Sequence, residues 1–401
     1  MKPAAPVAVT GIGCLCSAGL TLNACLDFLF RGERFPVLPS RFPADPDPGY
    51  PVFEVAEGFW IPGRFRSAPR SRTVRLALTA AHEACADAGL DRGILKRKRV
   101  GVCIGSNVAG SVSNPELFGK TGACDSDYPT PADRFSASNP AVGLAREFEL
   151  CGPLETVVTA CSAGTDALGL AASWIRMGLC DLVLAGGADE LYEITYNGFI
   201  SLMNSDSSAC KPFDADRKGL NLGEGAALFI LESEAVLQER GATPRGWILG
   251  YGTAGDAFHL TTPDPEGKGL HLAVRDALES SGISPSALAF INAHGTGTPD
   301  NDRIESRLFD ALFPGIPFLS TKGFTGHTLG AAGAVEAAFT LGCLERGRIP
   351  PSAGFTHSDP ELPASPVSRT TPVRGAAALS ETLAFGGNNA ALILGAEKGV
   401  K

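Results

Sequence analysis

Continuously apolar runs that lead into longer helical patterns are the feature that most constrains the fold of this chain. Examples lie at residues 99–107, 181–190, 226–232 and 288–297. Strands that are hydrophobic at every position are buried on both faces, which is typical of layered α/β proteins. The alternation of such strands with helices therefore predicts an α/β fold with a large, well-covered sheet.

The two halves of the chain echo each other in pattern, although not in identity. In the first half, ETVVTA leads to Cys161 and then to a helix of small residues, SAGTDALGLAASWIRMG. In the second, PFLSTK (317–322) leads through GFTGH to LGAAGAVEAAFTLGCLERG (329–347). Both helices carry Ala and Gly at helical spacing, so both can pack closely against a sheet. The best linker is 239–246, which divides the chain into domains of residues 1–240 and 245–401.

Composition excludes several classes of function. The formal net charge is −9, whereas general nucleic-acid binding requires a basic surface. No apolar run reaches the roughly 18 residues that cross a bilayer. Pro3 and Pro6 interrupt the apolar start, so we interpret residues 6–13 as a first strand and not as a signal peptide. The eleven cysteines lie mostly within apolar runs without a CxxC pair, which predicts reduced thiols in a cytoplasmic protein.

Cys161 stands at the junction between a predicted strand and a predicted helix. Unpaired N–H groups and the positive end of the helix dipole would face its sulfur, which lowers the pKa of a thiol. The same N–H groups can stabilise an oxyanion. Two other interpretations remain open from this segment alone: a buried structural cysteine, or a serine-hydrolase elbow in which Ser162 is the nucleophile.

Two of the six histidines lie in glycine-rich loops of the second half. His294 ends the predicted strand at 288–297, and His327 precedes a helix and follows Lys322 closely. Loops at strand ends are where α/β sheets build their sites. No HExxH motif and no histidine–cysteine cluster with zinc spacing is found, so no metal site is predicted.

Five ordered motifs together resemble the β-ketoacyl-(acyl carrier protein) synthases of the elongating Cys-His-His type. With the opening VAVTGIG they span almost the whole chain, and they are TACSAG (159–164), FDADRKGLNLGEGAALFILE (213–232), HGTGTPDND (294–302), KGFTGHTLGAAG (322–333) and AFGGNN (384–389). The resemblance implies a thiolase-like fold, in which duplicated βαβαβ halves form α-β-α-β-α layers. It also implies decarboxylative condensation of malonyl-carrier protein with an acyl thioester in fatty-acid, polyene or polyketide elongation.

The resemblance assigns roles to residues in both halves. Cys161 matches the residue that accepts the acyl group, and His294 and His327 match the histidines that assist decarboxylation. Lys322 matches the lysine of the family, and Glu305 matches its acidic partner; we assign this pair to organising the histidines. No separate cofactor is implied, because the substrates travel on the phosphopantetheine arm of acyl carrier protein.

Further residues match the substrate channel and the gate. Thr296 and Thr298 match hydroxyl groups that hold the pantetheine arm. The N–H of Phe385 would join that of Cys161 in the oxyanion hole, and the ring of Phe385 matches the gate to the acyl pocket. The implied assembly is a homodimer, or a heterodimer with a ketosynthase-like subunit.

Some positions depart from the family pattern. Gly323 stands in place of the usual serine, and Leu383-Ala384 replaces the usual Phe-Gly before the gate, which should stiffen a hinge there. Segment 113–140, expected near the dimer interface and pocket floor, does not align well, so acyl specificity stays open. A degradative thiolase and a non-catalytic partner subunit are the nearest alternatives. A degradative thiolase normally has a second cysteine near the C-terminus, whereas no cysteine follows Cys343 in this chain. A non-catalytic partner subunit usually lacks the nucleophile, which this chain keeps.

An acidic enzyme needs a local basic patch to bind an acidic carrier protein. Residues 62–75, PGRFRSAPRSRTVR, carry five arginines and no acid. Their position resembles the carrier-docking region of the family. We therefore predict that Arg66, Arg70 and Arg72 steer acyl carrier protein towards the site.

Overall fold

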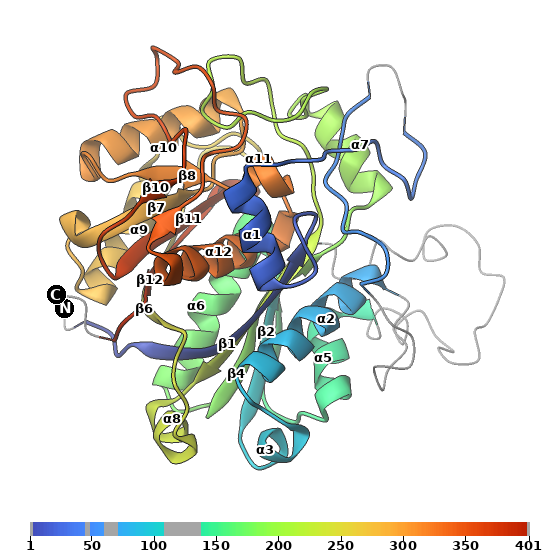
Figure 1. Cartoon of the computed structure of the whole chain (residues 1–401), viewed down its shortest axis with the longest axis vertical. Helices are drawn as coiled ribbons and strands as arrows, with labels where there is room; N and C mark the ends of the chain where they lie inside the picture. Colours follow the sequence, from blue (N-terminus) through green and yellow to red (C-terminus); the bar gives the residue numbers. More distant parts are fainter. Residues whose placement is uncertain (1–2, 45–48, 60–70, 108–137, 399–401) are drawn as a thin grey trace.

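The computed structural model describes residues 3–44, 49–59, 71–107 and 138–398. Strands and helices alternate as the apolar runs predict (Figure 1). The described strands form one ten-stranded sheet of order β3-β2-β4-β5-β1-β6-β12-β11-β7-β8 and a separate ribbon of β9 (Arg348–Ile349) and β10 (Thr371–Pro372). Within the described segments, no helix has both the length and the apolar character needed to span a bilayer.

The ten strands divide into two sets of five with the same internal order. The first set is β1 (Val7–Cys16), β2 (Val100–Gly105), β3 (Leu154–Val157), β4 (Leu182–Asp189) and β5 (Gly225–Glu232). The second set is β6 (Gly246–Gly255), β7 (Leu288–Ala293), β8 (Phe318–Ser320), β11 (Ala377–Ala384) and β12 (Asn388–Gly395).

Pairing directions repeat between the two sets. The edge pairs β3–β2 and β8–β7 are parallel, and so are β2–β4 and β7–β11. The remaining pairs, β4–β5–β1 and β11–β12–β6, are antiparallel. A short antiparallel contact between β1 and β6 joins the two sets. The echo seen in the sequence is therefore a structural duplication.

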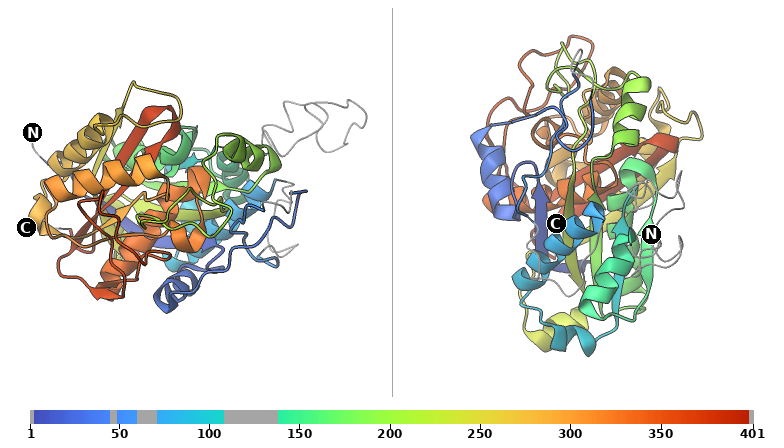
Figure 2. Two further views of the ribbon diagram at one scale, coloured as in Figure 1. Left: turned by 90° about the horizontal axis from the view of Figure 1, so that it is seen from above. Right: turned by 90° about the vertical axis from the view of Figure 1, so that its right-hand side faces the viewer.

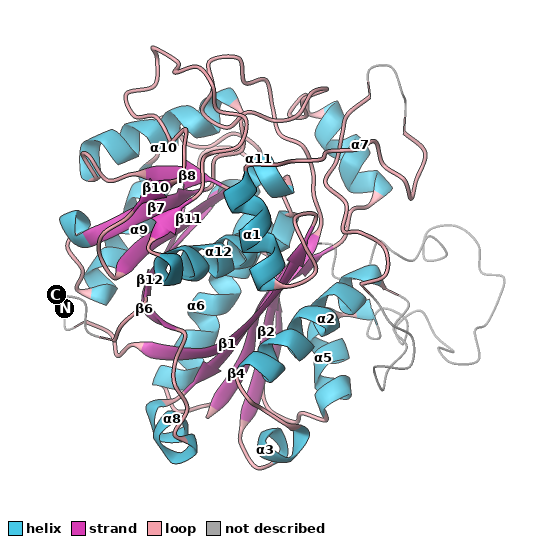
Figure 3. Cartoon of the chain, in the orientation of Figure 1, coloured by secondary structure: helices cyan, strands magenta, loops and turns pink. Residues whose placement is uncertain are grey.

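Helices form three layers around the strands (Figures 1 and 3). The central layer is α6 (Ala163–Arg176) and α12 (Ala332–Arg346), which pack on each other and each contact strands of both sets. Outside the first set lie α2 (Arg72–Asp87) and α5 (Pro140–Phe148). Outside the second lie α9 (Lys268–Ser281) and α10 (Pro299–Leu312). The expected α-β-α-β-α architecture is confirmed, and Figure 2 gives the same arrangement from two further directions.

Shorter helices complete the described chain. They are α1 (Leu22–Arg31), α3 (Arg92–Lys96), α7 (Glu193–Ser201), α8 (Glu234–Arg240) and α11 (Lys322–Thr325). Single 3₁₀ turns lie at Ala160–Ser162, Pro285–Ala287, Leu329–Ala331 and Phe385–Gly387. Every cysteine except Cys124 lies within the described residues and is a free thiol. Of these, all are buried except Cys151, which is exposed.

The duplication extends to the turn that introduces each central helix. Ala160 precedes Cys161 with φ 56°, and Leu329 precedes Gly330 with φ 55°. Each turn is one 3₁₀ turn that runs directly into α6 or α12. A side chain at positive φ is strained, so packing on both sides must hold these turns in place. Cys161 and Gly330 are thus equivalent positions, and only the first carries a nucleophile.

The central helices approach most closely at glycine, which provides a test of the packing. A Cβ atom on Gly164 would lie 2.9 Å from the backbone nitrogen of Ala334 and 2.9 Å from the carbonyl oxygen of Gly330. Backbone atoms cannot rotate away, so we expect Gly164→Ala to lower the free energy of unfolding by about 1–3 kcal/mol. Denaturant titration measures this change. Gly198→Ala, in exposed α7 with no atom within 4 Å of the new Cβ, is the matched control; equal stability of the two variants would contradict close packing at Gly164.

Candidate active site

Cys161 lies at the base of a pocket, on the turn between β3 and α6. Its sulfur accepts hydrogen bonds from its own backbone N–H and from that of Phe385, and both lower the pKa of the thiol. The ammonium of Lys322 lowers it further. Burial outweighs these effects and raises the pKa to about 11. The expected lowering of the thiol pKa by the helix amides is therefore outweighed, because desolvation disfavours the thiolate more than the amides stabilise it.

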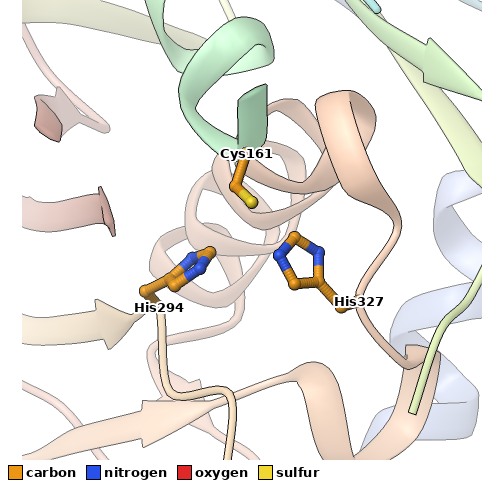
Figure 4. Close-up of side chains that lie close together, drawn as sticks. All are labelled: Cys161, His294 and His327. Carbon is orange, nitrogen blue, oxygen red and sulfur yellow. The ribbon is translucent and has the colours of Figure 1, made fainter. Parts of the chain in front are cut away.

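Two imidazoles from the second half of the chain face this sulfur (Figure 4). One ring nitrogen of His294, one of His327 and the sulfur of Cys161 all lie within 4.8 Å of one another. The ring centroids are 5.1 Å apart, with the ring planes at 86°. The sequence prediction that these three residues come together is thus consistent with the geometry.

Hydrogen bonds fix the tautomer of both rings. Nδ1 of His294 accepts a hydrogen bond from the ammonium of Lys322 (2.9 Å), and Nδ1 of His327 accepts one from the N–H of Leu329 (3.1 Å). With Nδ1 used as an acceptor, the proton of a neutral imidazole sits on Nε2. Both rings therefore present Nε2–H donors and no free lone pair. A zinc ion would require both tautomers to change, so the donor set does not suit a metal.

Burial also keeps the rings uncharged. It lowers the pKa of His294 and of His327 well below 6.5, and the charge of Lys322 lowers both further. Because the folded-state values lie below the unfolded value, the unfolded chain binds protons first on acidification. The stability contributed by these neutral rings is present above pH 6.5 and is lost as the pH falls from that value through the lower folded-state pKa values.

Lys322 is held by three acceptors. It is about 1 % exposed, and its ammonium donates to Nδ1 of His294, to the carbonyl oxygen of His294 (2.6 Å) and to the carboxylate of Glu336. The acidic partner is thus Glu336, and the prediction that Glu305 pairs with Lys322 is wrong. The signal missed in the sequence was a single carboxylate in the otherwise apolar helix LGAAGAVEAAF, where a buried charge needs a counter-ion.

Glu305 instead holds the loop that follows His294. Its carboxylate oxygens lie 3.0 and 2.9 Å from the N–H of Gly295, and Oε2 accepts a hydrogen bond from Asn301 (2.5 Å). Gly295 has φ 46°, so the chain turns sharply here. Glu305 supports the backbone of His294 and does not contact the lysine through a described hydrogen bond.

The pocket at Cys161 has a volume of about 190 Å³. Thr296 and Thr298 line it, with their hydroxyl groups 2.8 Å apart. Phe385 lines the opposite part and stacks on Phe199 of α7, with centroids 5.3 Å apart and ring planes at 15°. Phe199 was not identified from the sequence, where an aromatic residue in a short helix carries no distinctive pattern.

Comparison with known proteins identifies the family. Residues 4–236 match the N-terminal domain of β-ketoacyl synthases, and residues 245–356 match the C-terminal domain. The chain belongs to the β-ketoacyl synthase family. It is therefore a condensing acyltransferase of fatty-acid or polyketide chain elongation.

Individual relatives cover nearly the whole synthase. A polyketide β-ketoacyl synthase 1 of Streptomyces cyaneus is 35% identical, over 98% of this chain and 99% of its own. The 3-oxoacyl-[acyl-carrier-protein] synthase 2 of Staphylococcus aureus is 33% identical, over 80% and 83%. The ketosynthase ApeO, solved in complex with its chain length factor ApeC from Xenorhabdus doucetiae, superimposes with a TM-score of 0.83 at 30% identity, over 98% of each chain.

Ser162 has a structural environment in this synthase. It is fully buried, and its hydroxyl oxygen lies 2.8 Å from the carboxylate of Asp166 and 2.8 Å from the carbonyl oxygen of Thr159, either of which can accept its single proton. Neither acceptor is an imidazole that could remove its proton. The hydrolase interpretation with Ser162 as nucleophile is therefore not supported by the geometry.

The prediction that Arg72 steers acyl carrier protein is wrong. This residue opens α2, is 6 % exposed, and forms an ion pair of 2.7 Å with the buried carboxylate of Glu224. Its guanidinium also donates to the carbonyl oxygen of Val55 (3.1 Å). Arg72 therefore anchors α2 in the interior and cannot steer a partner in solution. Arg66 and Arg70, like residues 113–137, lie outside the described residues.

The buried ammonium can be tested through the histidines it contacts. We expect Lys322→Met to raise the pKa of His294 and of His327 by about one unit or more, because a positive charge next to each ring is removed. Titration of the imidazole resonances by NMR measures both values. Lys398→Met, which removes an exposed ion pair with Glu234, is the matched control and should change neither value. Unaltered histidine pKa values in Lys322→Met would contradict the role of the ammonium.

Proposed function

We propose that this synthase condenses malonyl-acyl carrier protein with an acyl group held on Cys161, and that His294 and His327 supply the hydrogen bonds for decarboxylation. One observation carries the proposal: two neutral imidazoles present Nε2–H groups towards the same sulfur at the base of the pocket. A pair of neutral donors stabilises a negative oxygen without a prior proton transfer.

The first half-reaction transfers the acyl group. The sulfur of Cys161 attacks the thioester carbonyl, and the backbone N–H groups of Cys161 and Phe385 receive the developing oxyanion. The bond to the pantetheine sulfur then breaks, and the departing thiolate takes up the proton that Cys161 loses. A protonated resting thiol suits this order, because ionisation is needed only when the substrate is in place.

The second half-reaction forms the carbon–carbon bond. The malonyl carboxylate leaves as carbon dioxide, and its bonding electrons form an enolate whose oxygen accepts the Nε2–H bonds of His294 and His327. The enolate carbon attacks the thioester on Cys161, and the tetrahedral intermediate expels the sulfur, which takes one proton from water. The pantetheine arm of the carrier lies against the hydroxyl groups of Thr296 and Thr298 at the entrance.

Assembly and location follow from the same proposal. Residues 1–240 and 245–401 form two halves of one catalytic unit, because the nucleophile comes from the first and the histidines from the second. The chain pairs with a copy of itself or with a ketosynthase-like subunit, as ApeO does with its chain length factor. A cytoplasmic location suits the free thiols of the described chain.

Acyl loading separates the two candidate nucleophiles. We expect Cys161→Ala to abolish the mass increase seen after incubation with acyl-acyl carrier protein, because the thioester cannot form. Ser162→Ala should still load, more slowly if the turn loosens. Intact-mass spectrometry measures both, and carriers of graded acyl length report the preferred chain. Loading of Cys161→Ala would overturn the proposed nucleophile.

Carrier docking is tested by charge reversal at Arg66 and Arg70. We expect Arg66→Glu with Arg70→Glu to raise the KM for acyl carrier protein roughly ten-fold and to weaken the salt dependence of that KM. The reason is that the arginines no longer steer the acidic carrier protein. Turnover of a small thioester mimic should not change. Arg275→Glu, at an exposed position on α9, is the control. Arg72→Glu should instead destabilise the fold, since it places a second carboxylate beside Glu224.

A further inference from the structure

Glu381 is a fully buried carboxyl group to which the condensation assigns no role. It lies on β11, and its Oε1 accepts the backbone N–H of His294 at 2.8 Å. Glu305, from α10, accepts the N–H of the next residue, Gly295. Two carboxyl groups from different elements thus bind consecutive amides on either side of a catalytic histidine.

Consecutive amides bring the two carboxyl groups together. They lie close enough to influence each other directly, and Glu381 Oε2, which is buried, accepts no hydrogen bond from a described donor. Two carboxylate oxygens carry no donor between them, so this contact is favourable only if one of the groups is protonated. Both residues are 0 % exposed, so bulk solvent does not reach the pair to screen two charges.

The charged groups around the pair also favour the state in which one of the two carboxyl groups is protonated. The ionisable groups that face the pair are Asp302 on α10, Lys322 on α11, Glu336 on α12 and His294 itself. One ammonium faces several acids, and that ammonium is already paired with Glu336. Burial raises the pKa of Glu305 and of Glu381, and the proximity of Glu381 raises that of Glu305 further. A second negative charge would therefore have no counter-ion.

We propose that Glu305 and Glu381 share one proton, and that this carboxyl pair positions the backbone of His294 so that its Nε2–H points at the reacting enolate. The inference rests on the proposed function of His294. Glu381 acts through the histidine and does not touch substrate, so it is a positioning residue. The shared proton replaces electrostatic repulsion with a hydrogen bond directly beneath the site.

The proposal predicts an alkaline limit on decarboxylation. As the pH rises through the raised pKa of the pair, the shared proton is lost, and two adjacent carboxylates push apart the loop that carries His294. The sign is the same for stability: the folded chain holds a proton that the unfolded chain has released, so stability falls as the pH rises.

The variant Glu381→Gln keeps the geometry of the pair but replaces the shared proton with a permanent amide donor. Its amide oxygen can accept the N–H of His294, while its NH₂ group donates permanently to Glu305. We expect the rate of malonyl decarboxylation in Glu381→Gln to stay within about three-fold of the wild type near pH 7. The alkaline limb of its pH–rate profile should move upward by a pH unit or more. Glu381→Ala should be at least ten-fold slower at every pH, because the amide and Glu305 both lose a partner.

A matched control and a direct measurement complete the test. Glu232 is also a buried glutamate on a strand, paired with Arg240 and Thr10; Glu232→Gln should leave the shape of the pH profile unchanged. Infrared spectroscopy of the wild type should show the carbonyl stretch of a protonated carboxyl group, absent from Glu381→Gln. This measurement does not depend on the activity of any variant.

The outcomes distinguish this inference from the proposed function. An identical alkaline limb in Glu381→Gln and the wild type, or no protonated carboxyl signal, overturns the shared proton while leaving condensation intact. A limb that shifts with sodium or potassium concentration also overturns it, because a cation would then lie between the carboxyl groups. Failure of the wild type to load Cys161 overturns the proposed function itself.

Discussion

The active site depends on one buried ammonium whose three hydrogen bonds are all used. An ammonium has three donors, and Lys322 directs them to the ring and carbonyl oxygen of His294 and to Glu336. Without these acceptors, a charge in this interior would cost far more than folding could supply. With them, the lysine fixes the tautomer of His294 and opposes protonation of both rings. The neutral donors of the site are therefore a consequence of where one positive charge is buried.

The duplicated fold explains how the site can be assembled from distant parts of the chain. The central helices α6 and α12 begin with equivalent turns and pack on each other in the middle layer. One turn presents Cys161, and the loops around the other present His327 and Lys322. Small residues at the contact let the two turns approach closely enough for a sulfur and two imidazoles to meet. Bulkier residues at this contact would leave both helices intact but would move the sulfur away from the imidazoles.

Much of this arrangement could be predicted from local sequence. Cys161 stands at a strand–helix junction among small residues, and His294 and His327 lie in glycine-rich loops, so periodicity and turn chemistry locate them. The α/β class and the repeat follow from the same pattern. What could not be predicted depends on partners distant in sequence. Lys322 pairs with Glu336 and not with Glu305, and Arg72 points into the protein towards Glu224, because three-dimensional burial decides which charges must be paired.

The thiol illustrates the same limit in energetic terms. Local sequence predicts the amides that stabilise a thiolate at Cys161, and the structure contains them. It does not predict how completely the sulfur is removed from water, and that desolvation is the larger effect. Elements distant in sequence decide it, among them the turn between β11 and β12, whose residue Phe385 lines the pocket.

Phe385, the predicted gate, lies between the end of β11 and a pair of glycines. Leu383 and Ala384 belong to β11 and pair with Asn389 and Asn388, so they are fixed in the sheet. Gly386 and Gly387 follow the gate with φ of 82° and 75°, values that glycine adopts without strain. The joint therefore lies after Phe385, not before it. Movement of the predicted gate would take the ring of Phe385 off its stack on Phe199, while its N–H, directly after β11, would stay directed at Cys161. Access to the pocket and stabilisation of the oxyanion would then be separate functions of this one residue.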